Sequence, residues 1–177
     1  MQNFAVQVII VTEFIMAEQK IITITGRSGS GKTTLIERLA REYISEGKKV
    51  SVIKSMRHDF EVDREGKDTY RYRSAGVHSA LITNGKKIAL MADITDDDTP
   101  LTLAEKYFSD YDIIIIEGFK EGETRKVEVI GDSSEIPLFE SDSNVVMVAS
   151  DRGFATELPL FKRNDIKSIR ECIDRLF

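Results

Sequence analysis

The stretch Gly26–Thr33 has the residue types and the spacing of a loop that holds phosphate groups. Its sequence, Gly-Arg-Ser-Gly-Ser-Gly-Lys-Thr, fits the pattern G-x-x-x-x-G-K-[ST]. Glycines let the backbone wrap closely, so that several N–H groups converge on phosphate oxygens, and a helix that opens from the loop adds positive potential. The pattern therefore predicts a nucleoside triphosphate site, and it leaves the base and the reaction open.

Each polar residue of this loop has an expected part in binding. We expect Lys32 to reach the β- and γ-phosphates and to neutralise charge there, and the Thr33 hydroxyl to ligate Mg²⁺. Thr34 is expected near the α-phosphate. The remaining phosphate contacts are expected around the loop backbone, at Gly26, Ser28, Gly29, Ser30 and Gly31.

A second acidic element follows a run of four isoleucines, Ile113–Ile116. Such a run predicts a central strand buried on both faces. Its carboxyl end carries Glu117, at the edge where open α/β sheets bind ligands. We expect Glu117 to hold Mg²⁺, directly or through water, or to polarise an attacking water, and Gly118 to allow close approach of the γ-phosphate. The alternative is a strand-end carboxylate that faces solvent.

The flanking patterns predict the scaffold that positions these groups. Lys20–Thr25 is a short β-branched strand, Lys32–Glu46 has the apolar spacing of a helix, and Val50–Ile53 is a second strand. Strand, helix and strand in this order form a βαβ unit, whose two strands are parallel.

Farther along the chain, the dipeptide Asn84-Gly85 lies between two apolar runs. It predicts a hairpin with a type I′ turn, in which both central residues have positive φ. Further elements are predicted at Leu101–Phe108 (helix), Val127–Ile130 and Val145–Ala149 (strands), and Ile166–Leu176 (helix, capped by Asn164 or Asp165). We predict a three-layer α/β fold of the P-loop NTPase type, with a mixed, mainly parallel sheet, an antiparallel hairpin and helices on both faces.

Composition limits the class of protein. The chain has 177 residues, a net charge of −5 and a single cysteine, Cys172. We expect one nucleotide-binding domain over 19–177, preceded by a leader, extension or extra edge strand over 1–18. One cysteine excludes an internal disulfide framework and favours the cytoplasm. The acidic charge disfavours nucleic acids and anionic membranes as partners, and no segment is apolar enough to span a bilayer.

Two further stretches, with the loop, resemble a known family. They are 52–76, which includes the run Asp63–Gly76, and Glu117-Gly118-Phe119-Lys120 followed by Lys126–Val129. In this order they resemble the molybdopterin-guanine dinucleotide biosynthesis adapters, the MobB family, over about residues 20–175. The resemblance implies binding of GTP with Mg²⁺, at most weak GTPase activity and a homodimer. It also implies partnership with the guanylyltransferase that joins GMP to molybdopterin, and with molybdopterin-binding proteins.

The segment 54–73 departs from that family in one respect. Members often carry Lys-His-x-His-His-Asp after the second strand, whereas Lys54–Asp59 keeps only His58. Arg57 is a candidate anion contact here, and Asp59 and Asp63 are candidates for holding Mg²⁺ or water. Two interpretations stand: a solvated mobile loop, or a segment that orders around the γ-phosphate and Mg²⁺ or contacts the pterin phosphate.

The sequence says little about which base of the nucleotide is bound. The chain has no Asn-Lys-x-Asp signature; Asp151 either faces the N1–H and 2-amino group of guanine or is an ordinary turn acid. The preference for GTP over ATP therefore follows from the resemblance. A P-loop small-molecule kinase is the alternative, although 121–144 holds a single arginine and does not look like a kinase lid. Two histidines and one cysteine argue against a nickel-type metallochaperone.

Overall fold

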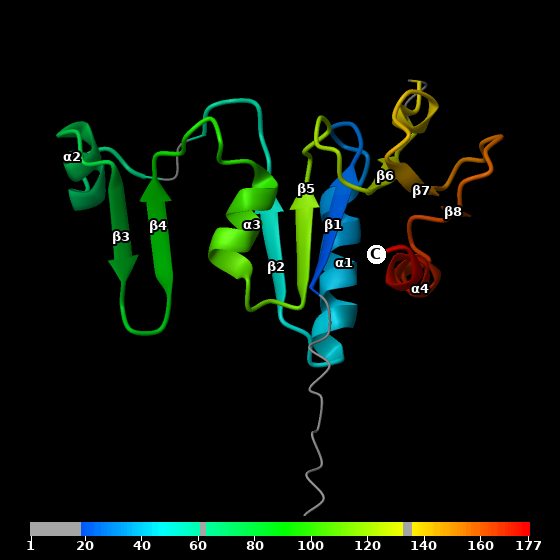
Figure 1. Ribbon diagram of the computed structural model, residues 1–177, viewed down its shortest axis with the longest axis horizontal. Helices are drawn as coiled ribbons and strands as arrows, with labels where there is room; N and C mark the ends of the chain where they lie inside the picture. Colours follow the sequence, from blue (N-terminus) through cyan, green and yellow to red (C-terminus); the bar gives the residue numbers. More distant parts are fainter. Residues whose placement is uncertain (1–18, 61–62, 133–135) are drawn as a thin grey trace, which may run out of the picture.

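The body of the molecule is a parallel six-stranded sheet (Figure 1). The structure is a computed structural model, and it describes residues 19–60, 63–132 and 136–177. Every strand pair of this sheet is parallel. In spatial order the strands are β2 (Val50–Lys54), β5 (Ile113–Glu117), β1 (Lys20–Thr25), β6 (Lys126–Ile130), β7 (Val145–Ser150) and β8 (Leu160–Phe161).

Helices cover both faces of the sheet. On one face α1 (Lys32–Ser45) and α4 (Ile166–Leu176) pack against alternate strand residues, and on the other α3 (Pro100–Phe108) packs on β5. All four isoleucines of β5 are buried: Ile113 and Ile115 belong to the α1 and α4 side, and Ile114 and Ile116 to the α3 side. The predicted three-layer P-loop fold class and the doubly buried central strand are confirmed.

Local signals fix the ends of the helices. Gly31, with φ of 101°, precedes α1, and the Thr99 and Thr102 side chains form a capping box at the start of α3. The Asp165 carboxylate accepts a hydrogen bond from the Ser168 N–H, so Asp165 rather than Asn164 caps α4.

The hairpin is set apart from the main sheet. Strands β3 (Ser79–Thr83) and β4 (Ile88–Ala92) pair only with each other among the described residues, and α2 (Asp68–Ser74) contacts β3 (Figure 1). The six-stranded sheet is therefore parallel rather than mixed. The antiparallel pair that we expected within it forms a second, two-stranded sheet.

The turn of this hairpin also differs from the expected type I′. Only Gly85 has positive φ, at 79°, because the Asn84 side chain accepts hydrogen bonds from the N–H groups of Lys86 and Lys87. The asparagine thus stabilises a four-residue connection instead of adopting the left-handed conformation itself.

Sequence patterns missed the two-residue strand β8 and the short 3₁₀ helix Leu138–Glu140. The alternatives for 1–18 fall outside the described residues. Within the described residues, no helix combines the length and the apolar character needed to cross a membrane.

A buried ion pair ties β6 to the segment before β7. The Lys126 side chain is 1% exposed, and its Nζ lies 2.7 Å from Asp142 Oδ2. Burial alone would raise the pKa of Asp142, but hydrogen bonds from Lys126 and from the Asn144 N–H bring it below its usual value. The folded state therefore prefers the ionised carboxylate.

We predict that Asp142→Ala lowers the free energy of unfolding by about 3–5 kcal/mol, because it leaves a buried ammonium unpaired. The double variant Lys126→Met/Asp142→Ala recovers most of this loss. Since the folded-state pKa is lowered, the pair stabilises above the unfolded-state pKa, and this contribution is lost as the pH falls through the folded-state value. Urea unfolding at neutral pH measures the loss; an unchanged midpoint for Asp142→Ala would contradict the assignment.

Candidate functional site

The loop between β1 and α1 has a backbone that only glycine permits at its first position. Gly26 has φ of 137°, and a Cβ there would lie 2.2 Å from the carbonyl oxygen of Val129 on β6. Gly29 and Gly31 also have positive φ. The loop is thus seated against β6 at one end and continues into the first turn of α1 at the other, as a phosphate-binding loop requires.

Polar atoms around the loop lack protein partners. The Ser30 Oγ and the Thr25 Oγ1 are buried, and neither has a hydrogen-bond partner within the described residues. Buried hydroxyl groups normally make hydrogen bonds. Two buried hydroxyls without a partner beside one loop therefore indicate a place for water or a ligand. Thr33 and Thr34 are exposed in the first turn of α1.

Lys32 lies partly buried, and its Nζ donates a hydrogen bond to the carbonyl oxygen of Arg27, 2.7 Å away. Burial lowers the pKa of Lys32; the Glu117 carboxylate opposes this, and the ammonium groups of Lys120 and Lys54 lower the pKa further. Lys32 therefore has one carboxylate and two further ammonium groups near it. Such an excess of cations favours an anionic ligand.

A cleft of about 530 Å³ opens beside Lys32. Its lining residues follow the carboxyl ends of β1, β2 and β5, which Figure 1 shows side by side. Three segments line it: the loop, through Gly26, Ser28 and Lys32; residues 54–58; and residues 117–121. The structure thus brings Lys32, Glu117 and Gly118 together, as the sequence predicted. His58 and Arg57 also line the cleft, and Arg57 pairs with Glu121.

Backbone contacts fix Glu117 at this edge. Its carbonyl oxygen accepts the Ser55 N–H at 2.8 Å, and the Gly118 N–H donates to Ile24 at 3.0 Å. Gly118 has φ of 98°, and a Cβ there would lie 2.6 Å from the Ser55 carbonyl oxygen, so this position also requires glycine. The strand ends of β1, β2 and β5 are therefore held together around one carboxylate.

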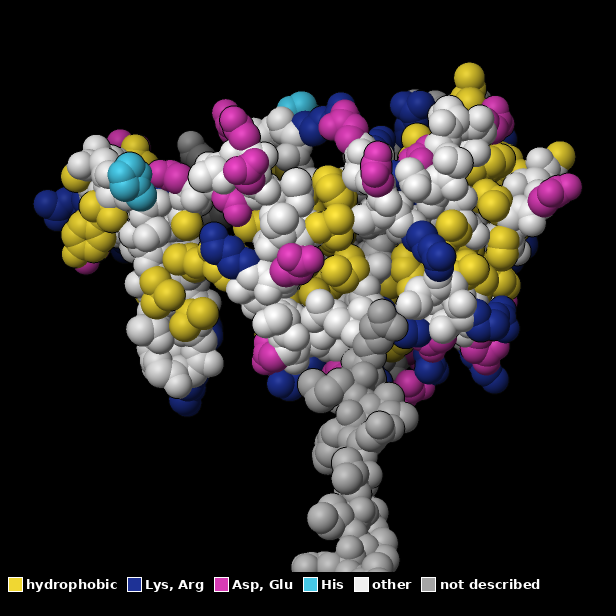
Figure 2. Space-filling view, in the orientation of Figure 1, with side chains coloured by type: hydrophobic (Ala, Val, Ile, Leu, Met, Phe, Trp, Pro, Cys, Tyr) yellow, Lys and Arg dark blue, Asp and Glu magenta, His cyan; other side chains and the backbone are white. Residues whose placement is uncertain are grey.

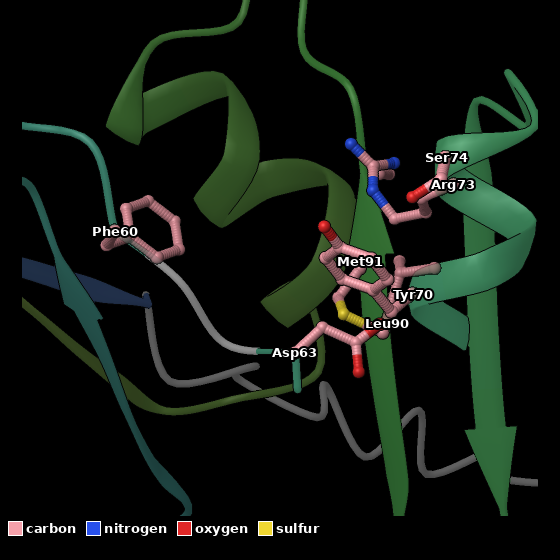
Figure 3. A pocket seen from close by; sticks show the side chains of 8 residues that line it. Phe60, Asp63, Tyr70, Arg73, Ser74, Leu90 and Met91 are labelled. Carbon is pink, nitrogen blue, oxygen red and sulfur yellow. The ribbon is translucent and has the colours of Figure 1, made fainter. Parts of the chain in front are cut away.

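Two carboxylates of the predicted site lie elsewhere. Asp59 is exposed and does not line the cleft. Asp63 lines a separate pocket of about 360 Å³ with Tyr70, Arg73 and Met91 (Figure 3). There its Oδ1 accepts hydrogen bonds from the Thr69 hydroxyl and the Arg64 N–H. Across the described part of the chain, no three His, Cys, Asp or Glu side chains gather as a metal-binding cluster.

Asp151 also lies outside the cleft, in a network that sequence reasoning missed. Its carboxylate accepts hydrogen bonds from the Arg163 backbone N–H and Nε, at 3.2 and 2.7 Å. Arg163 Nη1 also donates to the carbonyl oxygen of Ser30, 3.1 Å away. Arg163 thereby braces the glycine-rich loop from the C-terminal part of the chain. The two-residue strand β8 precedes Arg163, and no pattern had predicted it.

A family model described as Molybdopterin guanine dinucleotide synthesis protein B, MobB, matches residues 21–151. The chain belongs to the MobB family. The match includes the glycine-rich loop and all three segments that line the cleft. The family inferred from the sequence motifs is therefore confirmed.

Individual MobB relatives are similar over most of their length. The molybdopterin-guanine dinucleotide biosynthesis adapter proteins of Haemophilus influenzae and Escherichia coli are 34% and 30% identical over 155 and 154 residues. These alignments cover 87% and 82% of this chain, and 87% and 86% of the relatives. A crystal structure of molybdopterin-guanine biosynthesis protein B superposes with a TM-score of 0.73 at 26% identity, covering 89% of this chain and 100% of that one.

The Arg163 bridge gives a prediction about the MobB loop. Arg163→Ala removes the donor to Ser30, so we expect amides of 28–32 to exchange with solvent about fivefold faster, which corresponds to about 1 kcal/mol. Hydrogen–deuterium exchange with mass spectrometry measures this. Arg41→Ala, on the exposed side of α1, is the matched control and leaves the rate unchanged. Equal rates in both variants would show that the bridge does not brace the loop.

Proposed function

We propose that this MobB-family protein is a GTP-binding adapter of molybdenum cofactor biosynthesis, which assists the guanylyltransferase that joins GMP to molybdopterin. The observation that carries the proposal is the cationic cleft at the glycine-rich loop, in a chain whose relatives are named adapter proteins. The guanylyltransferase and molybdopterin-binding proteins are the proposed partners. The cytoplasm is the proposed location, in keeping with the free, buried thiol of Cys172.

The loop has the groups that a triphosphate needs. Backbone N–H groups of 26–34 would bind the phosphate oxygens, and Lys32 would exchange its bond to the Arg27 carbonyl for the β- and γ-phosphates. The unpaired Ser30 hydroxyl supports a polar ligand at this place. Gly118 lines the cleft without a side chain, so the γ-phosphate could approach its backbone closely.

The oxygen donors nearby suit Mg²⁺. The Thr33 hydroxyl and the Glu117 carboxylate are hard ligands, and Mg²⁺ commonly takes one or two protein oxygens together with phosphate oxygens and water. Asp59 is a further candidate, which would have to approach from its exposed position. When bound, Mg²⁺ would neutralise phosphate charge.

We propose that hydrolysis is at most slow. Two glutamates line the cleft, and one of them, Glu121, is paired with Arg57. Among the described lining residues, Glu117 is then the one unpaired carboxylate, and it would both hold the metal and orient a water; His58, the other lining group that could accept a proton, is exposed. A protein with this site binds and presents a nucleotide rather than turning it over rapidly.

Guanine selectivity is proposed to depend on Asp151. Arg163 already uses part of the hydrogen-bonding capacity of its carboxylate, but each oxygen has two lone pairs, so the N1–H and 2-amino group of guanine can still be accepted. The Arg163 contact to Ser30 keeps this carboxylate close to the loop.

We propose a homodimer formed through the hairpin. Apolar side chains on β3 and β4 are exposed, with Ile88 at 69% and Leu81 at 53%, and they appear as yellow patches on the hairpin in Figure 2. A mostly apolar groove of about 470 Å³ runs between β4 and α3. Exposed apolar faces of this kind favour a protein partner, and a second copy supplies the same apolar surface.

The nucleotide proposal predicts that Lys32→Ala weakens GTP binding by about 100-fold or more, because a charge-assisted contact to the phosphates is lost. Isothermal titration calorimetry with GTP and ATP in Mg²⁺ measures the affinities. Lys87→Ala, in the hairpin turn, serves as the control and retains wild-type affinity. Undiminished binding in Lys32→Ala would refute the loop assignment, and fast acceptor-dependent turnover would favour a kinase.

The dimer proposal predicts that Ile88→Glu converts the protein to a monomer, since burying a carboxylate in an apolar interface is unfavourable. Light scattering coupled to size exclusion measures the mass. Ile44→Glu is the matched control, because Ile44 is an exposed apolar residue on α1, and it keeps the dimer. A wild-type protein that runs as a monomer at high concentration would overturn the proposal.

A further inference from the structure

Two lysines of the cleft have no assigned partner. Lys54 and Lys120 line the same cleft as Lys32, and neither side chain makes a hydrogen bond or an ion pair within the described ranges, although Lys120 also lines a second pocket together with Glu128. Both ammonium groups lie near enough to Lys32 to disfavour its charged form. Glu117 offsets part of this repulsion, and three ammonium groups against this one carboxylate favour binding of a further anion.

Strained backbone positions Lys120. The two residues before it, Gly118 and Phe119, have φ of 98° and 41°, and Phe119 is the one non-glycine residue with positive φ in the described structure. The Phe119 ring packs on the cluster between β5 and α3 and lies so close to Gly122 that a Cβ there would be 2.2 Å from the ring. Strain held in place by packing is typical of functional turns.

Lys54 reaches the cleft from the neighbouring strand. It is the last residue of β2 and lies opposite Glu117 in the parallel register of β2 and β5. Lys54 and Lys120 therefore line the cleft from two different segments. Each is held by sheet or turn geometry, not by a flexible terminus.

The cleft has more positively charged side chains than one bound nucleotide requires. In the proposed function the triphosphate uses the loop backbone and Lys32, and its metal uses Glu117. Arg57 and Glu121 neutralise each other. Lys54 and Lys120 are the lysines of the cleft that this scheme does not use.

We propose that Lys54 and Lys120 form a second anion subsite, which binds the phosphate monoester of a second substrate beside the nucleotide. The proposal rests on the proposed function, because it assumes a nucleotide on the loop. A phosphate monoester is a compact dianion that two ammonium groups can bind and neutralise. Their charges would also reduce the repulsion between the two bound phosphate groups.

The test uses the full-length protein saturated with Mg²⁺ and the β,γ-imido analogue of GTP. Phenyl phosphate is titrated in and followed by ³¹P NMR. We expect saturable binding to the wild-type protein, weakened at least about tenfold in Lys54→Ala and in Lys120→Ala and largely kept in Lys120→Arg. The hairpin variant Lys87→Ala is the control and binds as the wild type does. Affinity for the GTP analogue stays within about threefold in all of them.

Three results would overturn the subsite. Phenyl phosphate that fails to bind the loaded wild-type protein excludes a second anion. Loss of analogue binding in both alanine variants assigns the two lysines to the nucleotide itself. Binding of inorganic phosphate without phenyl phosphate indicates a place for released phosphate and excludes a monoester substrate.

Failure of the proposed function gives a different result. If the wild-type protein binds no guanine nucleotide, the same titration is run without nucleotide. Phenyl phosphate binding that requires Lys54 and Lys120 but tolerates Lys32→Ala upholds the subsite on its own. Absence of binding, or dependence on Lys32 alone, refutes it.

Discussion

The close contact between Gly26 and the Val129 carbonyl determines how the functional end of this molecule is built. No side chain fits at that point, so the loop can cross directly from β1 over the end of β6 before α1 begins. Gly118 likewise leaves no space for a side chain, because it lies against the Ser55 carbonyl oxygen. This contact is at the end of β5, on the opposite side of β1 from β6. At Gly26 and at Gly118 the backbone thus packs directly against the carbonyl group of another segment. The cleft lies between these two contacts, at the carboxyl ends of β1, β2 and β5.

Charge, rather than shape alone, distinguishes this cleft from the other hollows of the molecule. The pocket beside Asp63 has one acid and one arginine, Arg73, among aromatic and aliphatic residues, and the groove between β4 and α3 is mostly apolar. The cleft combines Lys32 with two further lysines, Lys54 and Lys120. Since the chain as a whole is acidic, this local excess of positive charge gives anions a defined place to bind.

The sequence predicted what depends on local pattern. Glycine spacing located the loop, four consecutive isoleucines located β5, and Glu117 followed from the end of that strand. Long-range contacts were not predictable in this way. Arg163 reaches Ser30 across most of the chain, after a strand of only two residues. The hairpin was predicted, but whether it joins the main sheet depends on pairing that no local pattern encodes.

The connection between the cleft and the hairpin bears on how an adapter would work. The chain leaves the cleft at His58 and continues to α2, which contacts β3 of the exposed hairpin. Residues that line the cleft are therefore joined, through one segment, to the surface proposed for a protein partner. A ligand that draws Lys54–His58 inward would alter the start of that segment. This arrangement suits a protein that acts through ligand-dependent contacts.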